Sequence, residues 1–523
     1  MVRESPEVVE AEHLDDSSSA SNTSQLVAWC GRIAGPLLAF LVYLYLGSLD
    51  TLTPEAAKTG AMATLMAVWW MTEAIPLPVT SLLPLVLFPL CGILELSAAA
   101  PSYANKFIFL FMGGFMIARA VEKWNLHRRI ALLTVSVVGT QPTRLVAGFM
   151  LATAGLSMWI SNTASTVMML PIGLSLVSLL REQLQQADRR SGGAGKNFAT
   201  CMMLGIAYAA SIGGLATLVG TPTNLFLAGF ADEKQIAIGF GRWMLFATPL
   251  AVVLLALTWL LLTRVIFPIR VKRLEGSHDL IRTELAKMGS VSRGEWTVLI
   301  VFALTALAWV VREPLTNWQW LVAWVPLIAK LDDTIIALIG MISLFLIPVN
   351  LRKGEAALDW DTAVNIPWGV LLLFGGGFCL AEAVSDSGLA EWIGTRVEVL
   401  ELSTFALMVA VVTMVVFLTE LTSNTPTAAT FLPILYGVAQ SMSVDPMLLL
   451  VPATIAATCA FMLPVATPPN AIVFGSGHIE IRSMVRAGLW LNLVSIVLIS
   501  LWMWLVGARV FGIATGLPLM DSN

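Results

Sequence analysis

Long apolar runs, separated by short polar segments, cover most of the chain. A helix crosses about 30 Å of hydrocarbon with roughly 17 to 25 apolar residues, and eleven runs approach that length. They lie near residues 33–48, 57–72, 77–93, 107–121, 198–219, 243–267, 294–311, 334–349, 366–384, 447–465 and 486–507. This pattern predicts an all-α polytopic membrane protein with about eleven transmembrane helices.

Two further apolar stretches, residues 142–180 and 403–440, are too long for a single crossing. Each is interrupted at its centre by the same polar triplet, Ser-Asn-Thr, which begins at Ser161 in the first stretch and at Ser423 in the second. A helix that ends at such a triplet, followed by a helix that starts there, would enter the membrane and turn back. We therefore expect two re-entrant helical hairpins.

The positive charges indicate how these elements are oriented. With a cytoplasmic N-terminus and two re-entrant hairpins, 22 of the 30 Lys and Arg residues face the cytoplasm, which is a strong positive-inside bias. Counting either hairpin as a full crossing would move its downstream basic loops to the other face. The first hairpin is therefore expected to enter from the cytoplasm and the second from outside, in a multi-pass protein of the cell membrane.

The two halves of the chain resemble each other. The segment "FMGGFMIARAVEKWNL" from Phe111 matches "FGGGFCLAEAVSDSGL" from Phe374, the two triplets follow at nearly the same offset, and "GTPTN" (220–224) matches "ATPPN" (466–470). Similar packing of glycine-containing helices could account for one such match, but hardly for three in the same order. Because the hairpins enter from opposite sides, the pattern predicts an inverted repeat, as in many secondary transporters.

Composition supports a membrane protein and argues against several other classes. The chain of 523 residues is 57% hydrophobic and only 12% charged, whereas soluble domains carry about 25% charged residues. Residues 1–25 are acidic and Ser-rich and lack the basic flank of a signal peptide, so we expect a disordered tail. The five cysteines have no metal-ligand spacing and are interpreted as small buried hydrophobes. They are Cys30, Cys91, Cys201, Cys379 and Cys459.

No enzyme motif is present. The sequence contains neither a HExxH zinc motif nor a GxSxG nucleophile elbow. The segment "SGGAGKN" from Ser191 lacks the first glycine of a phosphate-binding loop and follows no predicted strand. We therefore expect a protein that is not an enzyme and that has the lipid bilayer, rather than nucleic acid, as a partner.

The breaks in the apolar runs predict an anion site. Ser, Asn and Thr are good N-cap residues, and Thr221-Pro222 and Thr467-Pro468 read as an N-cap followed by proline at the first helical position. Four helices would then begin inside the membrane, each with unpaired N–H groups and about half a positive charge. No Lys or Arg lies within nine residues of these motifs, so an anion would be held by amides and hydroxyls.

The helices that end at the same breaks offer oxygen atoms to cations. Ser157 and Thr419 each lie four residues before a triplet, on the same helix face. With the Asn side chains and carbonyls near Gly220 and Ala466, each half could form an oxygen cage that suits sodium. Two cations would balance a doubly charged anion.

Other polar residues have less defined roles. Glu73 and Glu420 are carboxylates in or near the membrane and are functional candidates by default. Glu420 could add negative charge to the second cation site, take a proton, or anchor the hairpin, whereas Glu73 precedes Pro76 near a span end and is interpreted as structural. His478 is expected to be solvated, and residues 269–293 to lie on the anionic inner leaflet.

Together the motifs resemble the divalent anion/sodium symporter family, which includes sodium-coupled di- and tricarboxylate transporters. They are "WWMTEAIPLPVTSLLPLVLFP", "SNTAST", "GTPTN", "TELTSNTPTAATFLPI" and "AFMLPVATPPNAIVF", and the likeness runs from about residue 30 to 510. The resemblance implies a homodimeric elevator-type transporter in which a scaffold dimerises and a transport domain carries the site across the membrane. Its expected parts are a tail (1–25), scaffold helices (26–140), transport-domain helices (141–268), a basic linker (269–293), scaffold helices (294–402), transport-domain helices (403–510) and a C-terminal tail (511–523).

The resemblance also assigns ligands, with sodium as the co-transported ion and no organic cofactor. One sodium would contact Ser157, Ser161, Asn162 and the carbonyl of Gly220, and the other Thr419, Thr422, Ser423, Asn424 and the carbonyl of Ala466. The substrate would contact Ser161, Asn162, Thr163, Pro222, Ser423, Asn424, Thr425 and Pro468.

Thr425 bears on the cargo. Relatives that carry citrate or sulfate often have Val at the third position of the second triplet, so Thr425 favours C4-dicarboxylates such as succinate, fumarate and malate. The main hypothesis is sodium-coupled symport of such anions. The alternatives are a sodium-independent dicarboxylate exchanger, a citrate or sulfate transporter and, from a different class, an anion channel or a substrate-sensing receptor.

Overall fold

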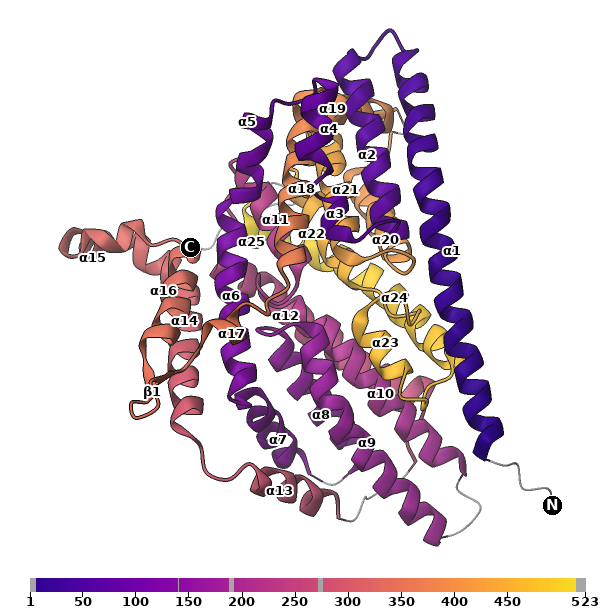
Figure 1. Cartoon of the computed structure of the whole chain (residues 1–523), viewed down its shortest axis with the longest axis vertical. Coiled ribbons are helices and arrows are strands. Elements are labelled where there is room, and N and C mark those ends of the chain that lie inside the picture. Colours follow the sequence, from indigo (N-terminus) through magenta and orange to yellow (C-terminus); the bar gives the residue numbers. More distant parts are fainter. Residues whose placement is uncertain (1–5, 140, 188–191, 271–275, 400, 514–523) are drawn as a thin grey trace.

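The computed structural model describes residues 6–139, 141–187, 192–270, 276–399 and 401–513. Within these ranges the chain is built of helices, with one two-stranded antiparallel sheet (Figure 1). Eight of the described helices are long and apolar enough to cross a membrane, and four shorter apolar segments accompany them. The predicted all-α polytopic fold is confirmed.

The first part of the chain contains α1 (Pro6–Gly47), α2 (Pro54–Thr72), α3 (Leu77–Thr80), α4 (Leu83–Cys91), α5 (Leu96–Ala99), η1 (Ala100–Ala104), α6 (Lys106–Lys123), α7 (Leu126–Val138), α8 (Pro142–Ser157), α9 (Asn162–Ala187), α10 (Gly192–Gly214), α11 (Pro222–Glu233), α12 (Phe240–Leu260), η2 (Leu261–Ile266) and α13 (Ser277–Lys287).

The second part contains α14 (Arg293–Asn317), α15 (Gln319–Trp324), η3 (Pro326–Lys330), α16 (Asp333–Leu346), β1 (Pro348–Asn350), β2 (Glu355–Ala356), α17 (Trp360–Ala363), α18 (Trp368–Asp386), α19 (Leu389–Glu398), α20 (Thr404–Leu418), α21 (Asn424–Ser441), α22 (Met447–Thr458), α23 (Pro468–Phe474), α24 (Ile481–Trp502), η4 (Met503–Gly507) and α25 (Ala508–Phe511).

Each of the eleven predicted spans overlaps a helix, but some helices are divided or end before the apolar run does. The run at 77–93 is divided into α3 and α4, where Pro84 lies in the first turn of α4 and cannot donate an N–H to the preceding turn. The run at 447–465 ends as a helix at Thr458. The apolar pattern therefore predicts where the chain lies in the membrane better than it predicts where each helix stops.

The N-terminal segment differs from the expectation. Residues 6–25, predicted to belong to a disordered tail, form the beginning of α1. No Gly or Pro occurs between Pro6 and Gly31, so nothing in this sequence terminates a helix. Most of the predicted C-terminal tail, residues 514–523, lies outside the described residues.

Both predicted hairpins are present and lie at opposite ends of the molecule. The first consists of α8 and α9 and the second of α20 and α21, with helix breaks at residues 158–161 and 419–423. Figure 1 shows α8 and α9 in the lower half, beside α7 and α13, and α20 and α21 in the upper half, beside α19. The hairpins therefore approach the middle of the molecule from opposite sides.

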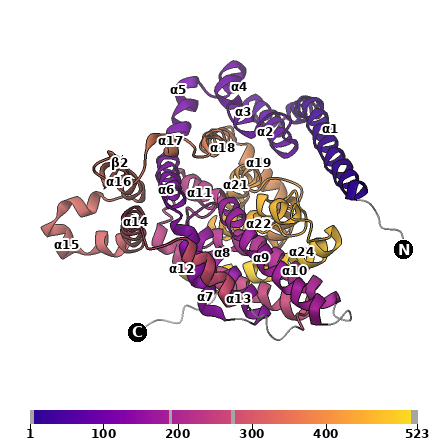
Figure 2. The same ribbon diagram turned by 60° about the horizontal axis from the view of Figure 1, so that its bottom comes forward.

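The helices outside the hairpins form the flanks. Figure 2 shows α14, α15 and α16 projecting to one side and α1 forming the opposite edge, with α6, α11 and α21 between them. Many apolar side chains of α1 and α14 are exposed, as expected for helices that face lipid. Cys201, Cys379 and Cys459 are buried, as predicted, whereas Cys30 is exposed on α1 and Cys91 is half-buried, so the interpretation as buried hydrophobes is wrong for Cys30.

A buried ion pair fixes the end of the molecule that contains α7 and α13. Arg129 of α7 and Glu295 of α14 are 8% and 4% exposed, and their Nε and Oε1 atoms are 2.6 Å apart. Arg129 also donates to the carbonyl of Gly289, while Glu295 completes a capping box with Ser292. The guanidinium thus joins the loop after α13 to the start of α14.

We expect Arg129→Ala to lower the free energy of unfolding by about 3–5 kcal/mol, because the carboxylate of Glu295 would remain buried without its partner. The neighbouring Arg128→Ala is the matched control. Its pair with Glu284 is partly exposed and is worth only about 0–1 kcal/mol. Thermal unfolding in detergent measures both variants, and equal losses of stability would contradict this assignment.

Candidate functional site

A cavity of about 460 Å³ lies where the broken helices meet. The N-termini of α9, α11, α21 and α23 all reach its wall, so the four predicted helix starts converge on one space. The lining residues from these helices and the loops before them are Ser161, Asn162, Thr163, Val219, Gly220, Thr221, Pro222, Ser423, Asn424, Thr425, Ala466, Thr467, Pro468 and Pro469. Such N-termini attract anions through their unpaired N–H groups and their dipoles.

Behind this wall, Ser157 ties the first hairpin to α10. Its hydroxyl is fully buried and lies 2.6 Å from Oδ1 of Asn162 and 2.7 Å from the carbonyl oxygen of Ala210. The hydroxyl has one hydrogen and can donate to one of these acceptors at a time. When it donates to Ala210, its lone pairs and Oδ1 of Asn162 face each other, which is an arrangement that a cation would stabilise.

The second hairpin repeats the same contacts. Thr419 is fully buried, and its hydroxyl lies 2.9 Å from Oδ1 of Asn424 and 2.7 Å from the carbonyl oxygen of Ala457. Ala457 belongs to α22, which corresponds to α10 of the first half. The geometry at each triplet is therefore reproduced with the same atom types.

The GTPTN and ATPPN segments also make matching contacts in the two halves. Asn224 donates through Nδ2 to the carbonyls of Gly214 and Thr217, and Asn470 does the same to Ala460 and Leu463. The carbonyl of Gly214 ends α10, and the others come from the non-helical segments before α11 and α23; such free carbonyls need partners inside a membrane. Both Asn side chains are fully buried, and their Oδ1 atoms have no hydrogen-bond partner among the described residues.

The N-caps before these motifs adopt nearly the same backbone conformation. Thr221 has φ −142° and ψ 144°, and Thr467 has φ −143° and ψ 148°. Pro follows each of them in the first turn of the helix, as predicted. The side chain of Thr467 accepts from the N–H of Asn470, whereas Thr221 makes no such capping bond.

Two glycines allow the chain to cross itself beside the first triplet. A Cβ atom added to Gly214 would lie 2.6 Å from Oδ1 of Asn162 and 3.0 Å from the carbonyl oxygen of Gly220. A Cβ added to Gly220 would lie 2.5 Å from the carbonyl oxygen of Gly214 and 3.0 Å from that of Met158. Several oxygen atoms therefore surround a small space beside Gly214 and Gly220, and a Cβ atom at either position would collide with them.

The two halves also differ at the residue that follows Ser157 and Thr419. In the first half the carbonyl of Met158 accepts a hydrogen bond from the hydroxyl of Thr217. In the second half the corresponding residues are Glu420 and Leu463, and the carboxylate of Glu420 accepts from the N–H of Leu463 at 3.1 Å. A buried carboxylate thus occurs on one side of the repeat only.

Glu420 binds the loop between α22 and α23. It is 3% exposed and accepts from the N–H groups of Phe461, Met462 and Leu463, at 2.7 to 3.1 Å, and from Nδ2 of Asn492 at 2.7 Å. No Lys or Arg bonds to it among the described residues. Of the roles left open by the sequence, anchoring the hairpin is the one for which this geometry supplies partners.

The structure brings together most of the predicted site residues. All the predicted substrate residues line the cavity, as do Gly220 and Ala466. Ser157, Thr419 and Thr422 do not line it and lie behind its wall, where Thr422 Oγ1 is 2.7 Å from Oγ1 of Thr427. Glu73 is the left-handed C-cap of α2, with φ 47°.

Sequence reasoning missed one part of the wall. The cavity is also lined by residues of α6 and of the segment around the start of α18, namely Phe111, Phe115, Ala118, Arg119, Glu122, Asn365, Pro367 and Val370. These residues belong to none of the motifs at the breaks. Five of them lie in the repeat segment from Phe111, but nothing in that segment marks a binding role, because these residues reach the site only through the packing of α6 against α11 and of α18 against α11 and α21.

Comparisons with known proteins agree on a family. The sequence model described as "Sodium:sulfate symporter transmembrane region" matches residues 28–511. The chain is 43% identical over 506 residues to the sodium-dependent dicarboxylate transporter SdcS of Staphylococcus saprophyticus, covering 95% of this chain and 94% of that protein. It is also 43% identical over 492 residues to SdcS of Staphylococcus aureus, covering 94% and 93%.

Two solved structures share the fold. The Alcanivorax borkumensis YdaH transporter superimposes with a TM-score of 0.55 at 15% identity, covering 85% of this chain and 98% of that one. The Neisseria gonorrhoeae MtrF structure, described with a class of antimetabolite efflux pumps, gives 0.53 at 13% identity and covers 81% and 86%. At these identities the likeness concerns the fold alone.

We expect Glu420→Gln to destabilise the tip of the second hairpin. The new NH₂ group would face N–H donors, so at least one hydrogen bond to a charged acceptor would be lost, at about 1.5–3 kcal/mol. Glu73→Gln is the matched control, because the described structure shows no hydrogen bond or ion pair for the carboxylate of Glu73. Thermal unfolding in detergent compares them, and an unchanged melting temperature for Glu420→Gln would show that the carboxylate is not an anchor.

Proposed function

The chain belongs to the sodium:sulfate symporter family, the divalent anion/sodium symporters, and from that premise we propose that it is a sodium-coupled transporter of C4-dicarboxylates. Its curated relatives are named as sodium-dependent dicarboxylate transporters, and a transporter rather than an enzyme agrees with the absence of an enzyme motif. The observation that carries the proposal is the convergence of four helix N-termini on one cavity inside the membrane-spanning region. That arrangement suits a small dianion.

In this proposal the substrate carboxylates bind to the two triplets. Hydroxyls, Asn side chains and N–H groups of Ser161, Asn162 and Thr163 would hold one carboxylate, and those of Ser423, Asn424 and Thr425 the other. Pro222 and Pro468 shape the wall between them. Thr425, with its hydroxyl, favours C4-dicarboxylates over citrate or sulfate.

Sodium would occupy the oxygen-rich spaces beside each triplet. The first space has the hydroxyls of Ser157 and Ser161, Oδ1 of Asn162 and the carbonyl of Gly220. The second has the corresponding atoms of Thr419, Ser423, Asn424 and Ala466, with Thr422 nearby. The paired acceptors at Ser157–Asn162 and Thr419–Asn424 support this assignment, since hard cations prefer oxygen ligands.

We also propose that the site moves as part of a rigid body. The scaffold would comprise residues 26–140 and 294–402 and the transport domain residues 141–268 and 403–510, related as an inverted repeat. Both α12 and α24 end in a π-helical turn, which adds to the matched contacts at the triplets. In the same proposal the protein is a homodimer in the cell membrane, its two scaffolds form the dimer contact, and the N-terminus lies in the cytoplasm.

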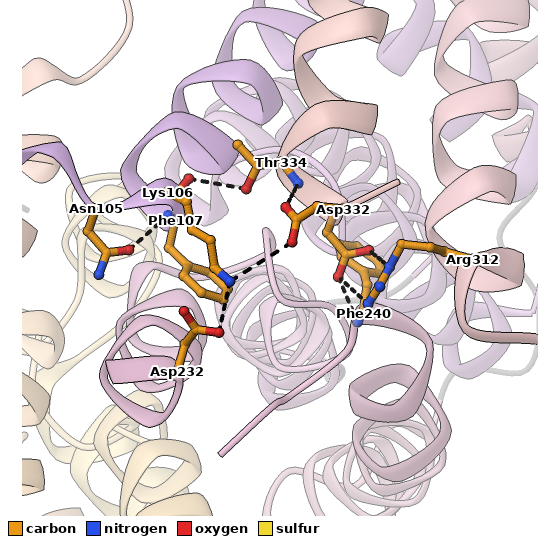
Figure 3. A network of polar contacts seen from close by, with 9 residues as sticks. Asn105, Lys106, Phe107, Asp232, Phe240, Arg312, Asp332 and Thr334 are labelled. Carbon is orange, nitrogen blue, oxygen red and sulfur yellow. Dashed lines mark hydrogen bonds and ion pairs between the residues drawn. The ribbon is translucent and has the colours of Figure 1, made fainter. Parts of the chain in front are cut away.

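Polar contacts join these two proposed bodies. Lys106 of the scaffold pairs with Asp232 at the end of α11, with Nζ and Oδ1 2.8 Å apart, and lies 4.0 Å from Asp332 (Figure 3). Asp333 of α16 binds Arg312 and accepts from the N–H of Phe240 at the start of α12.

The two residues after Asp232, at the end of α11, also bind residues of the proposed scaffold. Glu233 accepts from Asn105 at 2.8 Å, and Lys234 donates to Ser385 at 2.9 Å. Three consecutive residues of the transport domain thus bind the scaffold at the end opposite to α7 and α13. We propose that these contacts hold that end closed and that the site is reached from the α7 side.

The first test is succinate uptake into proteoliposomes with an inward sodium gradient, with potassium in place of sodium, and with internal succinate. We expect uptake to require sodium and to fall at least about tenfold in Ser161→Ala and Ser423→Ala, as when a charge-assisted hydrogen bond is lost. Ser175→Ala, on the exposed side of α9, is the matched control.

Other outcomes of this assay separate the alternatives. Sodium-indifferent uptake that appears only with internal dicarboxylate would mean an exchanger. Uptake of citrate or sulfate without succinate would change the cargo, and steady unitary currents would mean a channel.

The close approach of Gly214 to Asn162 and Gly220 gives a test of the first proposed sodium site. We expect Gly214→Ala to place a methyl group against Asn162 and Gly220 and to remove the thermal stabilisation that sodium chloride gives over choline chloride. Gly155→Ala, on α8 of the same hairpin, meets nothing within 4 Å and should keep it. Sodium stabilisation that survives in Gly214→Ala would exclude this space as a sodium site.

A further inference from the structure

The cavity wall carries one positive and one negative side chain. Among the described residues that line it, Arg119 is the only Lys or Arg and Glu122 the only Asp or Glu. Both come from α6, one turn apart, and neither belongs to a motif at the helix breaks. The cavity therefore contains a guanidinium that the helix N-termini do not account for.

This guanidinium is only partly engaged. Its Nη1 lies 2.6 Å from Oε2 of Glu122, and no other hydrogen bond of Arg119 is present in the described structure. Its Nε is buried and has no partner there. A guanidinium offers five N–H donors in a planar fork that matches a carboxylate, so Arg119 has donors available for a second carboxylate.

Arg119 and Glu122 stand between the binding cavity and a second one. A more open cavity of about 460 Å³ is formed by α6, α7 and the start of α9. It shares Arg119, Glu122, Ser161 and Thr163 with the binding cavity. An anion that leaves the first triplet toward α7 therefore passes the Arg119–Glu122 pair.

Nearby cationic groups do not offer an alternative. His127 lines the second cavity, but burial lowers its pKa below the ordinary value of 6.5, so it is neutral at pH 7. Lys123 lines neither cavity. It binds Asp359 at 2.6 Å and holds the pKa of that carboxyl at about 2.

We propose that Arg119 is a docking residue for the dicarboxylate at the cytoplasmic mouth of the binding cavity and that Glu122 competes with the substrate for it. The proposal rests on the proposed function. A carboxylate of the substrate that reaches Arg119 displaces Glu122, and Glu122 returns when the substrate leaves. The ion pair thus keeps the guanidinium from holding the product tightly on the side where it is released.

The test measures the KM for succinate separately at each face, in right-side-out and inside-out membrane vesicles. Arg119→Met should raise the KM at the cytoplasmic face about fivefold, the range of a partly exposed ion pair, and leave the external KM unchanged. Arg119→Lys should restore most of the affinity. Glu122→Gln should lower the cytoplasmic KM and slow efflux, because the competitor is gone.

Two further variants complete the design. Lys123→Met removes a charge from the same helix turn but from neither cavity wall, and should change neither KM. In the double variant Arg119→Met/Glu122→Gln, the KM at the cytoplasmic face should equal that of Arg119→Met alone, since Glu122 acts through Arg119.

The outcomes are distinguishable from failure of the proposed function. A wild-type protein that transports succinate, with variants that change both faces equally or change only the maximal rate, would overturn the docking role alone. The same holds if Arg119→Lys behaves like Arg119→Met. A wild-type protein that takes up no dicarboxylate would overturn both proposals.

Discussion

The structure depends on one constraint: non-helical backbone at membrane depth must find its hydrogen-bond partners inside the protein. Helical structure is interrupted there between α8 and α9, between α10 and α11, and at the corresponding places in the second half. Each interruption frees N–H and C=O groups. Buried side chains satisfy part of them, as Asn224 and Asn470 do for the carbonyls before α11 and α23, and Glu420 for the N–H groups of the loop after α22. The N–H groups that remain at the helix starts face the cavity, where an anion can use them.

Much of this arrangement could be predicted from sequence because its signals are local. A polar triplet inside an apolar run predicts a break, and Thr-Pro predicts a helix start, so the hairpins and the four N-termini followed directly. Arg119 could not be found in this way, since it lies about 40 residues before the first triplet and reaches the cavity only through helix packing. The anchoring bonds of Glu420 were likewise hidden, because Phe461 to Leu463 are apolar residues that contribute only their backbone. Residues 6–25 show the opposite case, in which polar composition favoured a tail although nothing in the sequence terminates a helix.

The two halves are matched in backbone but not in charge. Ser157 and Thr419 make the same contacts, yet Met158 in one half corresponds to Glu420 in the other. A carboxylate beside one candidate cation space and a carbonyl beside the other give the two spaces different electrostatic potentials. If the halves arose from a common unit, their chemistry has diverged while their geometry has been kept, so the two ions of the proposed cycle would not be equivalent.

The strengths of the contacts fall into two groups. Glu420 and the Arg129–Glu295 pair are buried and each lies within one proposed body. Of the contacts that join the bodies, Asp333 with Phe240 is buried as well, whereas Lys106 and Asp232 are 46% and 35% exposed. Exposed pairs are worth about 0–1 kcal/mol and can exchange their partners for water. In the proposed rigid-body movement the boundary between the two bodies must open, and a pair of this kind can part there. Lys106 at the start of α6 and Asp232 at the end of α11 would then separate and re-form at a cost comparable to the thermal energy.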